Sequence, residues 1–129
     1  MNQTTYQPTE EQEQAAVYQW AASMNGRFPE LKLLFHIPNG GMRSKPEAAR
    51  FKKAGVKAGV PDLFLPVARG RCHGLFVEMK RRKGGRVSEE QEAWIDALGQ
   101  QGYMCVVAHG AEAACCYIQE YLEINPLWE

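Results

Sequence analysis

The sequence lacks a long apolar run, and this absence excludes a protein that crosses a membrane by helices. No stretch of the 129 residues approaches the roughly 20 consecutive apolar residues that a bilayer-spanning helix needs. The first residues contain neither a basic region nor an apolar core, so they do not have the pattern of a signal peptide. We therefore expect a cytoplasmic protein with no membrane partner.

Cysteine is sparse and has no pattern that would build a metal site. The four cysteines are Cys72, Cys105, Cys115 and Cys116, and none of their spacings matches a zinc-binding motif. Cys115 and Cys116 are adjacent and cannot readily share a tetrahedral site. We expect all four to be reduced and structural.

Repeats and low-complexity segments are also absent, and the composition is that of one globular domain. Hydrophobic residues make up 45% of the chain and charged residues 23%. A chain of this length is long enough for one hydrophobic core. We expect a loose N-terminal segment over residues 1–8, a single domain over 9–124 and a short tail over 125–129.

The net charge of the whole chain is zero, but charge is divided unevenly along it. Residues 43–86 contain 13 of the 15 Lys and Arg residues and three acids, a local net charge of +10. The remainder has two basic residues and twelve acids, a net charge of −10. This asymmetry favours a polyanion bound at one face, while the acidic remainder argues against a histone-like binder. The alternative is that the basic side chains are solvated and scattered in space.

Charged residues interrupt two apolar runs in the middle of the chain. The first run begins at Asp62, and the second ends at Glu78-Met79-Lys80. Side chains alternate faces along a strand, so Glu78 and Lys80 share one face and Met79 lies on the other. If the two runs pair as a hairpin around residues 68–73, Asp62 lies beside the end of the second run. Two carboxylates and one ammonium group then meet in one place.

This combination suits metal-dependent cleavage of phosphodiester bonds. Two carboxylates, here Asp62 and Glu78, bind a hard divalent cation through oxygen, and Mg²⁺ keeps positions open for water and phosphate. Such a metal lowers the pKa of its bound water and neutralises charge that develops on the phosphate. Lys80 would orient the attacking water or stabilise the same charge. The alternative is an ordinary salt bridge on the solvent face of a strand.

Pro61-Asp62 followed by Glu78-Met79-Lys80 resembles the PD-(D/E)xK signature of the restriction-endonuclease-like nucleases. The flanking sequence resembles the VRR-NUC family (virus-type replication-repair nucleases), and the resemblance covers nearly the whole chain with all three signature positions intact. It implies a nuclease of a bacterium or a phage-infected host cell, with Mg²⁺ or Mn²⁺ as its cofactor. The segments that carry the resemblance to this family are Ile37 to Gly41, Ala54 to Asp62 and Ser88 to Gln91.

The resemblance implies further site residues. The backbone carbonyl of Met79 becomes an additional metal ligand. A glutamate of the first helix joins the active site, and the family's Ser-Glu-x-x-x-Gln pattern selects Glu10, with Glu13 as the alternative. Gln91 borders the metal site in the family, although its place in a capping box with Ser88 is a complete structural explanation.

DNA contacts are expected in basic segments on both sides of the proposed metal site. A turn with two glycines, before the second helix, has backbone amides that can approach a phosphate closely, although a plain turn is an equal reading of these residues. The basic segment after Lys80 is expected to be a flexible loop that binds phosphate. The predicted DNA-binding residues are Asn39, Gly40, Gly41, Arg43, Ser44, Lys53, Lys57, Arg81, Arg82, Lys83 and Arg86.

Helix and strand signals predict the order α-β-α-β-β-α-β-α. The predicted fold is α/β, with a four-stranded mixed sheet flanked by helices, and it is also the restriction-endonuclease-like core that the resemblance implies. The N-cap residues Thr9, Ser44 and Ser88 open the first three helices, and a fourth covers residues 111–122. The predicted strands include residues 31–37, the two runs of the hairpin and residues 103–108.

These features favour a metal-dependent DNA endonuclease that recognises DNA shape rather than sequence. The resemblance implies a homodimer that cleaves branched DNA, especially four-way (Holliday) junctions, because symmetric cleavage needs two active sites. Two alternatives stay open. A flap or single-strand nuclease would use the same chemistry, but few aromatic residues lie near the basic stretch. A non-catalytic DNA-binding subunit of a repair or replication complex is disfavoured by the intact Asp62, Glu78 and Lys80 set.

Overall fold

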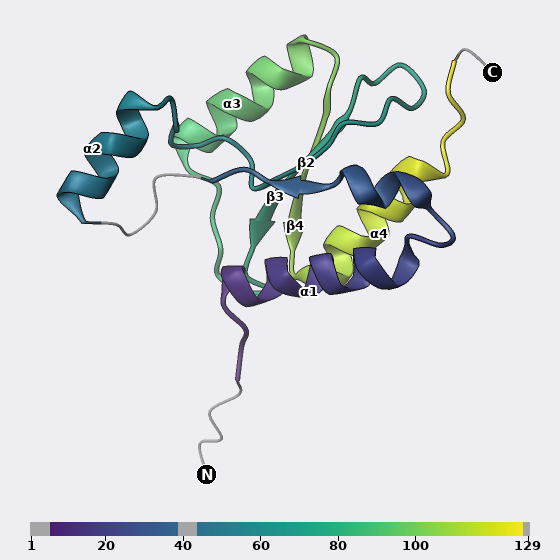
Figure 1. Ribbon diagram of the computed structural model, residues 1–129, viewed down its shortest axis with the longest axis horizontal. Helices are drawn as coiled ribbons and strands as arrows, with labels where there is room; N and C mark the ends of the chain where they lie inside the picture. Colours follow the sequence, from purple (N-terminus) through teal and green to yellow (C-terminus); the bar gives the residue numbers. More distant parts are fainter. Residues whose placement is uncertain (1–5, 39–43, 128–129) are drawn as a thin grey trace.

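The predicted order of helices and strands is confirmed, with one 3-10 helix added. The computed structural model of the chain describes residues 6–38 and 44–127. Figure 1 shows the arrangement of the elements. They are α1 (Glu10–Met24), the 3-10 helix η1 (Pro29–Leu33), β1 (Phe35–His36), α2 (Lys45–Lys53), β2 (Leu63–Leu65), β3 (Leu75–Lys80), α3 (Glu89–Gln100), β4 (Met104–His109) and α4 (Ala111–Leu122).

All three predicted N-caps open a helix. The Thr9 hydroxyl accepts a hydrogen bond from the Gln12 backbone N–H at 3.1 Å, and the Gln12 side chain accepts one from the Thr9 N–H at 2.9 Å. Ser88 repeats this reciprocal arrangement at the start of α3. The Ser44 hydroxyl accepts from the Glu47 N–H at 3.4 Å. Each cap satisfies a backbone donor that the first helical turn leaves without a partner.

The four strands form one mixed sheet in the order β1-β2-β3-β4. Both β1–β2 and β2–β3 are antiparallel, whereas β3 and β4 are parallel. The register pairs Leu63 with Val77 in the hairpin, and Val77 with Val106 in the parallel pair. Strand β3 lies between β2 and β4, so Glu78 and Lys80 near its C-terminal end are flanked by β4 on one side and by the segment that leads into β2 on the other.

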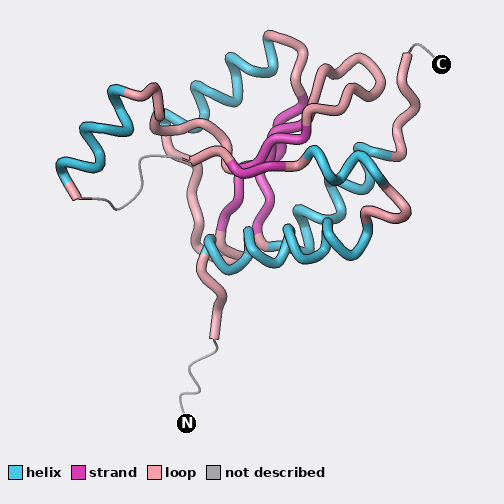
Figure 2. The backbone as a smooth tube through the Cα atoms, viewed as in Figure 1, coloured by secondary structure: helices cyan, strands magenta, loops and turns pink. Residues whose placement is uncertain are grey.

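Helices α1 and α4 lie together against one face of the sheet, while α2 and α3 lie on the other side (Figure 2). The core on the first face contains Leu75, Val77 and Met79, which alternate along β3, together with Val17 of α1 and Ile118 of α4. The remaining residues of β3 therefore point toward the side of α3. This alternation directs Glu78 and Lys80 away from the main core.

The predicted strand over residues 31–37 is wrong in its first half. Pro29 stands at the start of η1, where the Leu31 N–H donates to the Phe28 carbonyl at 3.0 Å. Only Phe35 and His36 form the strand, and Phe35 is 47% exposed rather than buried. A short apolar run does not by itself distinguish a buried strand from a short helix, and here it contains both a 3-10 helix and an edge strand.

The structure describes both the helices and the cysteines. Within residues 6–38 and 44–127, no helix has the length and apolarity to cross a bilayer. The four cysteines are free thiols. Burial raises the pKa of Cys105 and of Cys115 to about 11. Both thiols are therefore protonated and poorly nucleophilic at neutral pH.

Candidate active site

The hairpin brings the three signature residues together. Leu63 pairs with Val77 in antiparallel register. One residue further along, this register places Asp62, directly before β2, opposite Glu78 of β3. Asp62 Oδ2 accepts a hydrogen bond of 2.7 Å from the backbone N–H of Met79. This bond fixes the Asp62 carboxylate against the strand that carries Glu78.

Burial distinguishes this cluster from a surface salt bridge. Asp62, Glu78 and Lys80 are only 8%, 2% and 5% exposed. Lys80 Nζ lies 3.4 Å from Glu78 Oε2. Burial and the charge of Asp62 raise the pKa of Glu78 to about 8, against the lowering effect of Lys80. One lysine therefore does not offset the cost of bringing two carboxylates together away from water.

One oxygen of Glu78 has the properties of a cation ligand. Within the described residues, Glu78 Oε1 is buried and has no hydrogen-bond partner. An unsatisfied buried acceptor costs about 1–3 kcal/mol, and more when it is charged. The neighbouring Asp62 carboxylate adds a second hard oxygen donor. Mg²⁺ is typically bound through one or two carboxylates, with water and substrate phosphate completing its shell, so the residues present fit this ion.

The site is a two-carboxylate arrangement rather than a multi-residue metal cluster. Over residues 6–38 and 44–127, no group of three or more His, Cys, Asp or Glu side chains is placed to hold a metal ion. The chain would thus supply few ligands of its own. Additional coordination is left to the Met79 carbonyl that the family resemblance implies, to water and to the substrate.

Gln91 both caps α3, as its capping box predicts, and hydrogen-bonds Glu78. Its side-chain oxygen accepts a hydrogen bond of 2.9 Å from the Ser88 N–H, and its side-chain nitrogen donates to Glu78 Oε2 at 3.2 Å. Because the Ser88 N–H can only donate, the cap orients the amide with its NH₂ group toward Glu78. Capping of α3 and positioning of the carboxylate are therefore coupled through one side chain.

A glycine permits the close approach of α3 to the start of the hairpin. Gly59 has φ of +90°, and a Cβ atom there would lie 2.9 Å from the backbone carbon and oxygen of Glu90. Only glycine has both the conformation and the space. This contact holds the N-terminus of α3 against the segment before Asp62, and Gln91 of the same helical turn reaches Glu78.

The first helix directs Glu13 inward, whereas Glu10 is exposed. Glu13 is 2% exposed and accepts two hydrogen bonds from Arg82, at 3.0 and 3.2 Å. A Cβ atom at Gly110 would lie 2.8 Å from Glu13 Oε2, so the carboxylate also packs against the end of β4. Glu13 is thus held by Arg82, while Glu10 lies exposed at the first position of α1.

The basic loop after β3 is anchored rather than free at its start. The Arg81 carbonyl accepts a hydrogen bond of 3.0 Å from His109 Nδ1. The Arg82 guanidinium binds Glu13, and the Lys83 N–H donates to Gln7 at 2.9 Å. The side chains of residues 81, 83 and 86 remain exposed. The structure thus separates Arg82, which binds a carboxylate, from the other predicted phosphate ligands of this loop.

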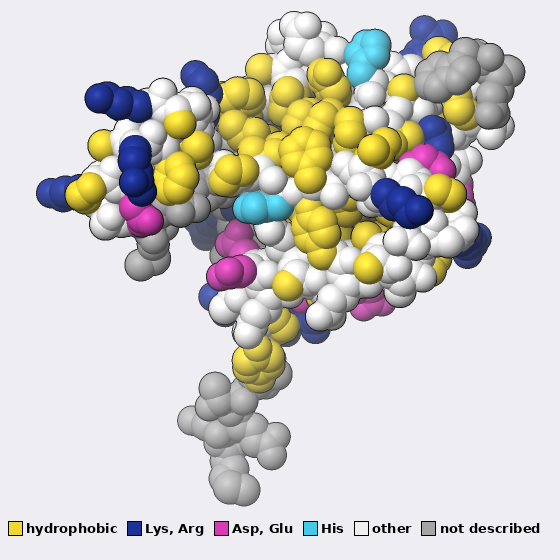
Figure 3. All heavy atoms as spheres, in the orientation of Figure 1, with side chains coloured by type: hydrophobic (Ala, Val, Ile, Leu, Met, Phe, Trp, Pro, Cys, Tyr) yellow, Lys and Arg dark blue, Asp and Glu magenta, His cyan; other side chains and the backbone are white. Residues whose placement is uncertain are grey.

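The other predicted DNA-binding residues lie around α2. Lys53 is exposed in the last turn of α2, and Lys57 is exposed in the loop that follows. The Ser44 hydroxyl is used for capping α2. Figure 3 shows Lys and Arg side chains projecting from this helix. Asn39, Gly40, Gly41 and Arg43 lie outside the described residues.

A groove between α2 and α3 was not anticipated from the sequence. Its volume is about 700 Å³. Trp94 of α3 and Phe51 of α2 both line the groove. Trp94 is distant from the basic residues of α2 in the sequence but lies near them in space. The pairing depends on how the two helices pack, and no local spacing indicates it. The other lining residues include Lys52, Lys57 and Glu90.

Comparison with known proteins identifies the family and the fold. A family model described as the VRR-NUC domain matches residues 8–112. A solved structure described as a VRR_NUC domain protein is 34% identical to this chain, with a TM-score of 0.80, over 95% of this chain and 94% of that chain. No curated protein matches. The chain belongs to the VRR-NUC family, whose domain is of the nuclease type.

Proposed function

We propose that this nuclease domain is a Mg²⁺- or Mn²⁺-dependent DNA endonuclease that hydrolyses phosphodiester bonds. One observation carries the proposal: Asp62 and Glu78 are buried side by side, and an oxygen of Glu78 has no partner among the described residues. A cation between these carboxylates would satisfy that oxygen and stabilise both charges.

Each residue of the cluster has a distinct task in this proposal. Asp62 and Glu78 would hold the metal, together with the Met79 carbonyl, and the backbone N–H of Met79 orients Asp62. When bound, the metal supplies a water of lowered pKa and neutralises charge on the phosphate. The Lys80 ammonium group orients the attacking water or donates to a phosphate oxygen. Gln91 holds Glu78 Oε2 in place.

Cleavage and binding measured on the same variants test the proposal. We expect Asp62→Asn and Glu78→Gln to abolish cleavage of labelled DNA in Mg²⁺ or Mn²⁺ while retaining DNA binding in EDTA. Asp96→Asn removes an exposed carboxylate from α3 and is the matched control, expected to cleave normally. Unchanged cleavage by Asp62→Asn would remove this residue from the metal site.

Branched DNA is the substrate that we propose, with a homodimer as the acting species. The basic surfaces of α2 and the 81–86 loop suit phosphate contacts along DNA rather than readout of bases. Hydrophobic side chains also gather across the middle of the face in Figure 3. Separately, Leu33 and Phe35 are about half exposed, the first just before the edge strand β1 and the second within it. An exposed apolar edge of this kind favours association with a second copy.

Light scattering and junction cleavage test this part of the proposal. We expect the wild-type chain to be a dimer and Phe35→Asp to be a monomer that has lost paired symmetric nicks in a four-way junction. Linear duplex and single-stranded DNA are the controls. Cleavage confined to flaps or single strands would retain the chemistry and reject the junction. Tight binding without cleavage in either metal would favour the non-catalytic alternative.

A further inference from the structure

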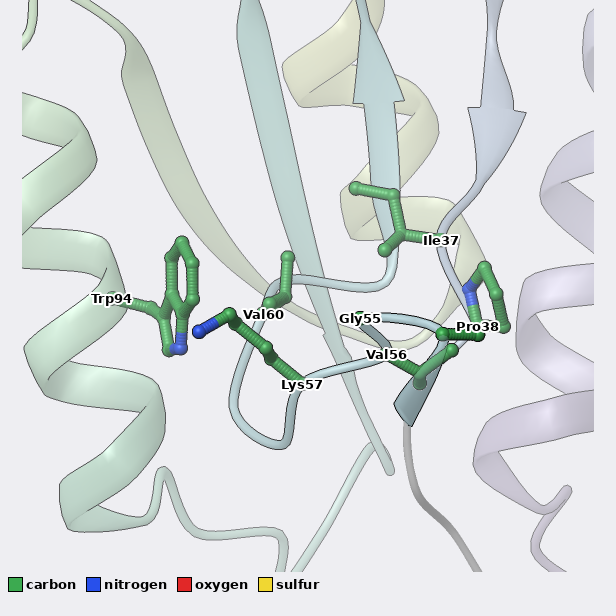
Figure 4. Close-up of a pocket in the computed structure, with 8 residues that line it drawn as sticks. Ile37, Pro38, Gly55, Val56, Lys57, Val60 and Trp94 are labelled. Atoms are coloured by element: carbon green, nitrogen blue, oxygen red, sulfur yellow. The ribbon is translucent and has the colours of Figure 1, made fainter. Parts of the chain in front are cut away.

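Two adjoining hollows form one groove beside α3 that the proposed chemistry does not use. The larger has a volume of about 700 Å³ and the smaller about 310 Å³. Figure 4 shows the smaller hollow, where the Lys57 side chain extends toward the Trp94 indole. Both volumes lie within the range of small-molecule binding sites. The residues that line both hollows are Gly55, Val56, Lys57 and Trp94.

The groove lies one helical turn along α3 from Gln91, which contacts Glu78 of the carboxylate pair. Trp94 follows Gln91 by three residues, so the two side chains share one side of α3 and are about 4.5 Å apart along its axis. Gln91 donates a hydrogen bond to Glu78. A DNA strand with its phosphate at Glu78 would therefore place an adjacent nucleotide within reach of Trp94.

The lining combines an aromatic surface with cationic side chains. Trp94 is half-buried, and Lys52 and Lys57 are exposed at the groove, with Glu90 as its one acidic residue. Helix α2 adds further positive charge, because it contains four basic residues and one acid. Aromatic faces that stack on bases, next to ammonium groups that bind phosphate, are the usual combination at sites for unpaired nucleotides.

The backbone beside Trp94 is open to a ligand as well. Gly55 has φ of +96°, and a Cβ atom placed on it would meet no atom within 4 Å. The main chain at Gly55 is therefore uncovered by described side chains on that side. A sugar or phosphate can approach such a position closely.

We propose that this groove binds one unpaired nucleobase of the DNA substrate, stacked on Trp94, with Lys57 on the adjoining phosphate. The inference rests on the proposed function, because it places that base next to the scissile phosphodiester bond. It specifies the substrate further: the DNA must expose an unpaired base near the cleavage site. Flaps and single-stranded arms at a branch point do so, and a four-way junction does so when a base pair at its centre opens, whereas continuous duplex does not.

Binding of branched DNA that lacks a single base tests the proposal. Branched DNA substrates carry one abasic site, moved nucleotide by nucleotide through the branch point and single-stranded arm, and anisotropy in EDTA measures affinity without cleavage. We expect one position at which loss of the base weakens wild-type binding about 5- to 100-fold, as for other stacked bases. Trp94→Ala should bind the intact DNA more weakly by a similar factor and lose this discrimination, while Trp94→Phe should keep most of it.

Matched controls separate stacking from folding and from charge. Tyr117→Ala removes an exposed aromatic ring from α4, in the other helical layer, and should leave discrimination unchanged. Circular dichroism and thermal melting verify that each variant is folded. Lys57→Gln should reduce the salt slope by about one without changing the preference for a base.

Two results would overturn the proposal. In the first, no abasic position weakens wild-type binding. In the second, Trp94→Ala weakens binding of intact and abasic DNA by the same factor. Neither depends on catalysis, so a protein that fails to cleave DNA can still show the discrimination, and an active nuclease can still lack it.

Discussion

The guanidinium group of Arg82 donates two hydrogen bonds to the buried carboxylate of Glu13 and joins the loop after β3 to α1. The hydrogen bonds and charge of Glu13 raise the pKa of Arg82 further above its usual range. A buried carboxylate requires such a partner, because removing it from water without one is costly. Arg82 therefore stabilises the fold, although the sequence favoured it as a DNA contact.

Substitution of neighbouring arginines separates these roles. We expect Arg82→Ala to lower the melting temperature, because it leaves Glu13 unpaired, with little change in the salt dependence of DNA binding. Arg81→Ala should leave the melting temperature nearly unchanged and should reduce the slope of binding against salt by about one for the lost phosphate contact. Thermal melting and binding at several salt concentrations measure both. Equal slope changes in the two variants would restore Arg82 to the DNA interface.

The pKa of Glu78 predicts how the metal-free protein responds to pH. It is raised from an ordinary value of 4.5 to about 8 by burial and by Asp62. Between these values the folded state holds a proton that the unfolded state has released, so stability falls as pH rises. In EDTA, we expect the wild-type melting temperature to fall relative to Glu78→Gln between about pH 5 and pH 8. A constant difference would contradict the raised pKa.

Metal addition should act in the opposite direction. A divalent cation binds the ionised carboxylate, so stabilisation by Mg²⁺ or Mn²⁺ should increase as pH rises toward 8. Glu78→Gln should lose most of this stabilisation, and the Asp96→Asn control should keep it. Melting curves with and without metal provide the measurement, which is independent of any nuclease assay.

The double role of Gln91 predicts different effects for the two partners of the α3 cap. Ser88→Ala removes a helix cap, at a cost of about 1 kcal/mol, and leaves the bond from Gln91 to Glu78 available. Gln91→Ala loses both contacts. We therefore expect Ser88→Ala to lower stability with modest loss of kcat, and Gln91→Ala to lower both. Equal kcat values for the two variants would show that Gln91 caps α3 but that its hydrogen bond to Glu78 does not contribute to cleavage.

The approach of Gly59 to α3 predicts a sharp contrast between two glycines. Gly59→Ala combines a positive φ with a contact of 2.9 Å to the Glu90 backbone, so we expect destabilisation of roughly 1–3 kcal/mol and reduced cleavage. Gly26→Ala is the control, since no atom lies within 4 Å of a Cβ there and its φ is not positive. Chemical denaturation measures both. Equal stability of the two variants would show that α3 can move aside without cost.

Features that depend on local chemistry could be predicted from the sequence. The caps at Thr9 and Ser88 follow from residues three positions apart, and the meeting of Asp62 with Glu78 follows from strand alternation and one hairpin. The burial of their charges could not be predicted in this way. It depends on β4 and α3, which cover β3 from a later part of the chain.

The remaining features depend on packing between distant segments. Several glutamates begin α1, and Glu13 is the one that shares the buried face with Val17 and Ala21. Its partner Arg82, however, comes from a distant part of the chain. The groove at Trp94 requires α2 and α3 to face each other, which no spacing in the sequence encodes. The residues 31–37 were assigned by hydrophobicity alone, which does not separate an edge strand from a 3-10 helix.

The anchoring of residues 81–83 by Gln7, Glu13 and His109 has a thermodynamic consequence for DNA binding. The conformational entropy of this segment is lost when the chain folds, so it is not lost a second time when a phosphate backbone arrives. The backbone that carries the exposed side chains of Arg81 and Lys83 is thus held in place. If these residues bind phosphate as proposed, a fixed backbone favours DNA whose phosphates already lie within reach of it, so the shape of the substrate becomes part of its affinity.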